Sequence, residues 1–80
     1  FNPETIIEYY VPKGGNVSLV VYNVMGQKMR TLVDRDHIMG SHYAVWDGRD
    51  DRGNLVASGV YFYQLHGQDA VVTKKMTLLR

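Results

Sequence analysis

The chain has 80 residues, no cysteine and a formal net charge of +1. This length allows one domain, and the lack of cysteine excludes disulfides, thiolate metal ligands and a cysteine nucleophile. The near balance of charge predicts no attraction to nucleic acid or to an anionic membrane surface. No apolar run approaches the roughly 20 residues that a membrane-crossing helix needs, so membrane insertion is not expected. Because the chain begins with Phe1 rather than methionine, we expect it to be a fragment of a longer protein.

Apolar residues recur with a period of two along most of the chain, which is the spacing of β-strands. The same segments are rich in β-branched and aromatic residues, which favour strands over helices. Strands are predicted at residues 5–11, 16–23, 28–33, 41–46, 59–65 and 69–79. The last segment is long enough for one strand or for two joined at a kink. The stretch 31–39 carries polar residues at 34–37 and ends before Gly40, so we expect a strand end and a loop there rather than a helix.

The alternation assigns one face of each strand to the core. The side chains predicted on these core faces are Ile7, Tyr9, Val11, Val17, Leu19, Val21, His42, Ala44, Trp46, Tyr61, Tyr63 and Leu65. In segment 28–33 the expected core contacts are Met29 and Leu32, whose positions differ in parity. A β-bulge or a strand end is therefore predicted between them.

Turn signals separate the predicted strands. The tetrapeptides 23–26 and 50–53 each begin with Asn or Asp and end with Gly, which is the signature of a type I turn followed by a positive φ. The tetrapeptides 37–40 and 66–69 are weaker versions. Short strands with turns every 8–12 residues or so predict an all-β sandwich or barrel. The length favours a two-sheet antiparallel sandwich, because a barrel this small would need very short strands.

The acidic stretch WDGRDDRGNL, residues 46–55, raises the question of a metal site. The carboxylates of Asp47, Asp50 and Asp51 could ligate calcium, but their spacing does not match an EF-hand loop. Arg49 and Arg52 lie among them and would repel a cation. Two successive turns are the favoured interpretation, and no metal or other cofactor is expected.

Catalysis and phosphate binding are also disfavoured. Serines, histidines and aspartates are present, but no serine lies in a G-x-S-x-G elbow. Gly14 and Gly15 precede a predicted strand rather than a helix, so no helix N-terminus is available to bind an anion. We therefore predict that the chain is not an enzyme.

Four aromatic residues fall on the predicted outward faces, namely Tyr10, Tyr22, Tyr43 and Phe62. A row of exposed rings could stack on sugars, which would make polysaccharide a possible partner. The same rings could form cross-strand pairs or contact a neighbouring domain.

Four motifs along the chain resemble the C-terminal sorting domains of the bacterial type IX secretion system. They are FNPETIIEYYVP, VSLVVYNVMGQKMRTLV, GSHYAVWDGRDDRGNLVASGVYFYQL and TKKMTLLR, and together they cover almost the whole sequence in order. The same pattern overlaps that of the immunoglobulin-like domain of the flagellar hook-capping protein.

The resemblance implies an immunoglobulin-like sandwich of about seven strands, spanning residues 1–80 as the C-terminal domain of a larger secreted protein. Its function would be non-enzymatic: directing cargo across the outer membrane and anchoring it at the cell surface. The implied partners are the secretion machinery and the upstream domain of the parent protein. The implied fold-defining residues are Trp46, Asp47, Gly48, Gly53, Gly59 and Tyr61. The implied sorting signal is Lys74, Lys75, Met76, Leu78, Leu79 and Arg80. Accessory carbohydrate binding and a structural spacer of an extracellular enzyme are the alternatives.

Overall fold

The alternating segments form strands in the computed structural model, which describes residues 4–79. The six strands are β1 (Thr5–Val11), β2 (Gly15–Asn23), β3 (Lys28–His37), β4 (Gly40–Trp46), β5 (Gly59–Gly67) and β6 (Ala70–Leu78). Within the described residues there is no helix, and hence none long and apolar enough to cross a membrane. The prediction of an all-β chain is confirmed, and residues 70–78 form one strand rather than two.

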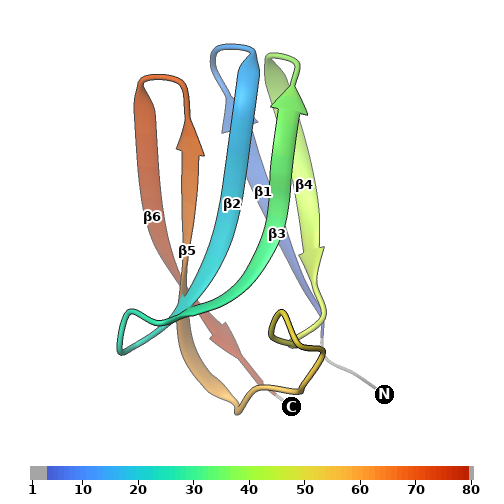
Figure 1. Cartoon of the computed structure of the whole chain (residues 1–80), viewed down its shortest axis with the longest axis vertical. Helices are drawn as coiled ribbons and strands as arrows, with labels where there is room; N and C mark the ends of the chain where they lie inside the picture. Colours follow the sequence, from blue (N-terminus) through green and yellow to red (C-terminus); the bar gives the residue numbers. More distant parts are fainter. Residues whose placement is uncertain (1–3, 80) are drawn as a thin grey trace.

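The strands form two antiparallel sheets. The smaller sheet pairs β1 with β4, and the larger has the order β3-β2-β5-β6. In Figure 1, β1 lies behind β2 and β3 and β4 stands to the right of β3, while β5 and β6 stand to the left of β2. The chain crosses between the sheets after β1, β3 and β4, and the tight hairpins β2–β3 and β5–β6 stay within the larger sheet. The two-sheet sandwich was predicted, but residues 4–79 supply six strands rather than about seven.

The core lies between the two sheets and follows the predicted alternation. One cluster joins Ile7, Tyr9 and Val11 of β1 to Val17 and Leu19 of β2. A second cluster contains Val21, Trp46, Val56, Tyr61 and Leu78. All the predicted core positions of β1 and β2 are buried, because successive side chains of a strand point to opposite faces. The residues His42, Ala44, Tyr63 and Leu65 are half-buried.

Strand β3 is longer than predicted and is bulged. Residues 34–37 continue the strand to His37, where we expected a loop, because they pair with residues 15–18 of β2. Their polar side chains are compatible with a strand because β3 lies at the edge of its sheet. The β2–β3 register shifts twice, so that Leu32 and Met29 have no direct partner in β2. The predicted irregularity between these two residues is thereby confirmed.

The two tetrapeptide turns have the predicted geometry. In each, the fourth residue donates its N–H to the first carbonyl, at 3.0 Å for Gly26 to Asn23 and 2.9 Å for Gly53 to Asp50. Gly26 and Gly53 have φ of 80° and 86°, a region that residues with a Cβ rarely adopt. The glycines in these turns therefore allow the chain to reverse and continue into the next segment.

The smaller sheet covers only part of the larger one. Val17, Leu19 and Val21 of β2, which face β1 and β4, are at most 1% exposed. On the same face of the larger sheet, Val72 of β6 is 42% exposed, although it pairs directly with Leu65. The inner face of β5 and β6 is thus left partly open beside β1.

Candidate functional site

The implied sorting signal lies on β6, an edge strand of the larger sheet. Strand β6 pairs with β5 on one side, and no strand of the described residues pairs with its other side. Lys75 pairs across from Phe62 and Lys74 across from Tyr63, so the two ammonium groups project from opposite faces of the sheet. Both lysines are exposed, as are residues 71–73 and Thr77. This edge therefore presents backbone groups and two cations to solvent.

Part of the implied signal belongs to the core. Leu78 is 1% exposed and packs in the cluster that contains Trp46 and Tyr61. Met76 is half-buried and packs against both clusters. Leu79 follows the strand and is 75% exposed. Arg80 lies outside the described residues. The side chains of Lys74, Lys75 and Leu79 are therefore accessible to a partner, whereas Leu78 is not.

The acidic stretch forms a turn whose first residue, Asp50, bonds to the backbone. Asp50 Oδ1 accepts the N–H groups of Arg52 and Asn54, each at 3.0 Å. Asn23 Oδ1 accepts the N–H groups of Met25 and Gln27 in the same way, at 2.9 and 3.0 Å. An aspartate and an asparagine thus perform one structural role in two places, as short polar side chains do in turns.

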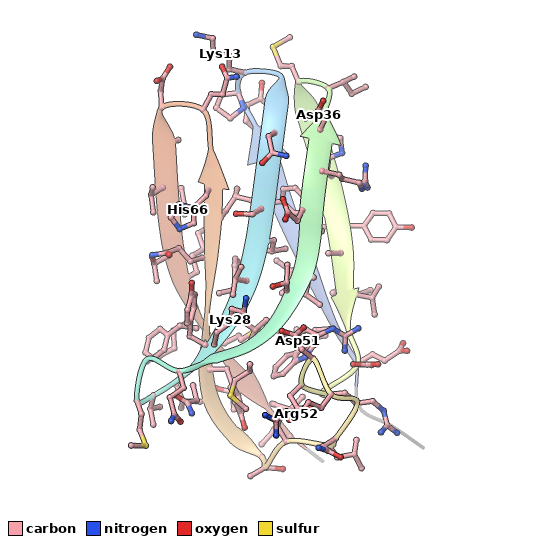
Figure 2. All side chains as sticks on the ribbon, in the orientation of Figure 1. Lys13, Lys28, Asp36, Asp51, Arg52 and His66 are labelled. Carbon is pink, nitrogen blue, oxygen red and sulfur yellow. The ribbon has the colours of Figure 1, made fainter. Side chains whose placement is uncertain are left out.

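The neighbouring aspartates attach this loop to β3. Asp51 donates its N–H to the Met29 carbonyl at 2.8 Å and accepts the Thr31 N–H on Oδ1 at 3.0 Å. Figure 2 shows Asp51 beside β3. Met29 is one of the two bulged residues and has no direct partner in β2. The loop therefore supplies a hydrogen-bond donor to the Met29 carbonyl at the edge of the sheet.

Asp47 connects the loop to the tryptophan. Its Oδ1 accepts a hydrogen bond from the Arg30 guanidinium and one from the Arg49 N–H, both at 3.1 Å. The Arg49 carbonyl in turn accepts the Trp46 indole N–H at 2.9 Å. The indole ring is fully buried and stands edge-on to Tyr61, with ring centroids 5.1 Å apart. Buried indole N–H groups need a partner, and the loop supplies it.

The carboxylates of this loop bind backbone N–H groups. Among the described residues no three His, Asp or Glu side chains are grouped so that they could hold a metal ion. Asp47, Asp50 and Asp51 each use an oxygen to bind backbone N–H groups of this loop or of β3. The geometry supports two successive turns over residues 47–53. The implied fold-defining glycines Gly48, Gly53 and Gly59 have φ of 74°, 86° and 148°, and Tyr61 donates its hydroxyl to the Ala57 carbonyl at 2.6 Å.

A buried tyrosine–histidine cluster was not predicted from the sequence. His37 is 6% exposed, and its Nδ1 lies 3.0 Å from the Arg35 carbonyl while its Nε2 lies 2.7 Å from the Tyr9 hydroxyl. A carbonyl can only accept, so neutral His37 donates through Nδ1 and accepts the Tyr9 proton on Nε2. His42 stacks on Tyr9 and meets His37 edge-on, with centroids 5.7 and 4.6 Å apart. Alternation continued along β3 from Val33 would have placed His37 on the core face.

The histidines bond to backbone carbonyls and to uncharged side chains. His42 bonds to the Ile38 carbonyl at 2.8 Å, and His66 bonds to Gln64 Oε1 at 2.6 Å. Neither these two hydrogen bonds nor the two contacts of His37 involve a serine or an aspartate. The rings of Tyr9, His37 and His42 pack against one another between the sheets.

Burial raises the pKa of the Tyr9 hydroxyl above its ordinary value of 10.0, and the Arg35 cation opposes this only in part. A raised pKa in the folded state means that the folded chain holds the proton more tightly than the unfolded chain. The resulting stabilisation is complete below a pH of about 10 and is lost as the pH rises through the folded-state pKa.

We expect the free energy of unfolding to fall above a pH of about 10, and to fall less steeply in Tyr9→Phe. The free energy of unfolding of the variant should also be lower by about 1 to 3 kcal/mol at neutral pH, because His37 loses the hydroxyl that donates to its Nε2. Urea unfolding of both proteins between neutral and alkaline pH measures this. All other side chains are the same in both proteins, so their contribution to the pH dependence cancels in the difference. Identical slopes would show that Tyr9 ionises as freely as in the unfolded chain.

The four outward aromatic residues are divided between the two sheets. Tyr10 and Tyr43 lie on the outer face of β1 and β4 and are 59% and 70% exposed. Tyr22 and Phe62 pair directly across β2 and β5 and are half-buried. The two sheets turn their outer faces in opposite directions, so the four rings do not form the single sugar-binding platform considered above. The pairing of Tyr22 with Phe62 is the cross-strand alternative.

Comparison with known proteins places the fold. No protein-family model matches the chain, and no curated protein matches it significantly. The crystal structure of FlgD from P. aeruginosa is similar, with a TM-score of 0.70 and 24% sequence identity over 95% of this chain. The chain spans 60% of the length of that FlgD structure. A sequence identity this low supports a shared fold but not a shared activity. The chain thus has an FlgD-like β-sandwich fold.

Proposed function

We propose that this chain is a non-enzymatic sorting and anchoring module, which directs a secreted cargo protein across the outer membrane to the cell surface. A protein receptor of the secretion machinery would recognise it, and the upstream part of the parent protein would be the cargo. Two things support the proposal: the four sequence motifs that resemble type IX sorting domains, and the sandwich fold in which those motifs lie.

The observation that carries the proposal is the position of β6. It is the last strand among the described residues and lies at a sheet edge, and six of its nine residues are exposed. Unpaired N–H and C=O groups of an edge strand can be recognised by a strand added from another protein. The side chains that alternate along β6 would then give specificity.

The two lysines of β6 affect which strands can pair with its edge. Charged residues on an exposed edge discourage pairing with unintended strands. A receptor with acidic residues opposite Lys75 would offset this repulsion, whereas a second copy of β6 would not. Lys75 projects from the outer face of the sheet, where the described residues provide no acid within ion-pair distance.

Deleting residues 74–80 is a poor test of this function, because it removes Leu78 from the core and would unfold the domain. A substitution at an exposed site avoids the problem. We expect Lys75→Glu to lower the exported fraction of a reporter fused ahead of residues 1–80, on the order of tenfold, because the charge opposite the receptor is reversed. The assay is secretion in a host that has the type IX machinery.

The matched control is Lys28→Glu, which makes the same charge change at an exposed position of β3. Thermal unfolding of both purified variants should match the original chain, since both sites are on the surface. Equal export of the Lys75→Glu fusion and the unsubstituted fusion would locate the signal away from this edge.

A further inference from the structure

A groove runs between β1 and the uncovered inner face of β5 and β6. Its volume is about 630 Å³, and part of it extends over β1 to Ser41, His42 and Tyr43 of β4. The rest of its lining includes Tyr9 and Tyr10 of β1, Tyr63 and Leu65 of β5, and Val72 and Lys74 of β6. A second hollow of about 150 Å³ shares Tyr10, Leu65 and Val72 with it and continues toward the β5–β6 turn. Between them the two hollows touch every residue from Glu8 to Lys13, a stretch long enough to lie beside an extended peptide.

The wall of this groove is an unpaired strand edge. Strand β1 pairs with β4 on one side, and within residues 4–79 no strand pairs with its other side. Nor does any hydrogen bond outside the β1–β4 ladder use a β1 backbone group in that part of the chain. In an antiparallel pair, alternate residues direct their N–H and C=O groups away from the partner strand. Those of β1 are therefore available to another strand.

The floor of the groove is mostly apolar and carries one cation. Leu65 pairs with Val72, and two residues along the strands Tyr63 pairs with Lys74 on the same face. These residues lie on the face that is buried elsewhere in the sheet, yet Val72 is 42% exposed and Lys74 is exposed. Lys74 has no acid within ion-pair distance among the described residues, whereas Lys13 at the far end lies 3.6 Å from Asp69. Glu8 borders the groove from the outer side of β1.

We propose that this groove binds an extended peptide segment of a partner protein, which adds to β1 as a third strand of the smaller sheet. Alternate side chains of the segment rest on the floor, one of them apolar against Leu65 and Val72. Strand residues two apart are about 7 Å apart on one face. The side chain two positions away therefore meets Tyr63 and Lys74, where a carboxylate complements the ammonium group. The groove thus selects peptides with an apolar residue and an acidic residue separated by one position.

This site is distinct from the outer edge of β6, and its test does not depend on export. A phage-displayed library of short linear peptides is panned on the intact chain, and the enriched peptides are synthesised. We expect enrichment of the apolar–x–acid or acid–x–apolar spacing, and slower exchange of backbone amides in Thr5–Val11 when a peptide is bound. The dissociation constant is measured by fluorescence anisotropy.

Two pairs of neighbouring residues provide matched variants. Val72→Lys and Lys74→Glu change the groove floor, and each should weaken peptide binding by on the order of tenfold or more. Val71→Lys and Lys75→Glu make the same changes on the opposite face of β6, and binding should be unaltered. All four sites are exposed, and thermal unfolding confirms that each variant is folded.

Several outcomes would overturn the proposal. They are a library that yields no binder, peptides that bind all four variants equally, and exchange protection on β6 with none on β1. A second copy of the chain occupying the groove would appear as a concentration-dependent dimer that Val72→Lys disrupts, and this too would rule out a partner peptide. Export that fails in Lys75→Glu while peptide binding persists would separate this site from the sorting edge.

Discussion

Replacing Trp46 with alanine should lower the free energy of unfolding by about 3 to 5 kcal/mol. The indole is the largest fully buried side chain, and its removal leaves a cavity between the sheets. The substitution also deprives the Arg49 carbonyl of its indole donor and Tyr61 of its edge-on partner. At about 0.05 to 0.15 kcal/mol per residue, a chain of this length has only about 4 to 12 kcal/mol of stability. The variant should therefore be largely unfolded at moderate temperature.

Urea unfolding followed by circular dichroism measures this effect. Trp46→Phe separates the two contributions, because it retains a buried ring but removes the hydrogen bond to the Arg49 carbonyl. Tyr43→Ala, at a residue of the same strand that is 70% exposed, should change stability by no more than about 0.5 kcal/mol. A midpoint for Trp46→Ala close to that of Tyr43→Ala would show that the tryptophan does not organise the core.

Leu78→Ala should cost about 2 to 5 kcal/mol, whereas Leu79→Ala should cost less than about 0.5 kcal/mol. The two leucines are adjacent in a segment implied to be a sorting signal, yet one is 1% exposed and the other 75%. Leu78 packs against the cluster of Trp46, Tyr61 and Val56, so truncation leaves a void there. The same urea titration measures both variants.

The pair also separates loss of folding from loss of recognition. If Leu78 acts only through the core, export of a Leu78→Ala reporter should recover when the cells are grown at lower temperature, in parallel with the folded fraction. Equal stability of the two variants would mean that the second cluster closes without β6. That result would contradict the packing of the last strand.

The strands and turns were predictable because their signals are local. Alternation in residues 5–11 and 16–23 reports which face is buried, and the Asn-x-x-Gly and Asp-x-x-Gly tetrapeptides determine their own turn geometry. The bulges near Met29 and Leu32 were also predictable, since a change of parity within a strand requires an extra residue. Each of these inferences needs only residues close together in the chain.

Features that depend on contacts between distant strands were not predictable in the same way. The end of β3 was expected to be loop because its residues are polar, but pairing with β2 makes it strand. The contact of His37 with Tyr9 joins positions 28 apart, and no local pattern reports it. The separation of Tyr10 and Tyr43 from Tyr22 and Phe62 likewise depends on which strands share a sheet. The different burial of Leu78 and Leu79 follows from the alternation of side chains along a strand, but treating both leucines as parts of one motif obscured it.

The attachment of the acidic loop to β3 limits how copies of this domain can aggregate. Asp51 occupies backbone groups of Met29 and Thr31 at one margin of the larger sheet, and the charged side chains of Asp34, Arg35 and Asp36 line the remainder of that margin. A fibre that grows without limit needs two sheet edges on every molecule that can each accept a strand, and the loop and these charges hinder pairing at the β3 edge. Association of copies through the larger sheet is therefore directed to the β6 edge, where a twofold pair would close and stop further growth.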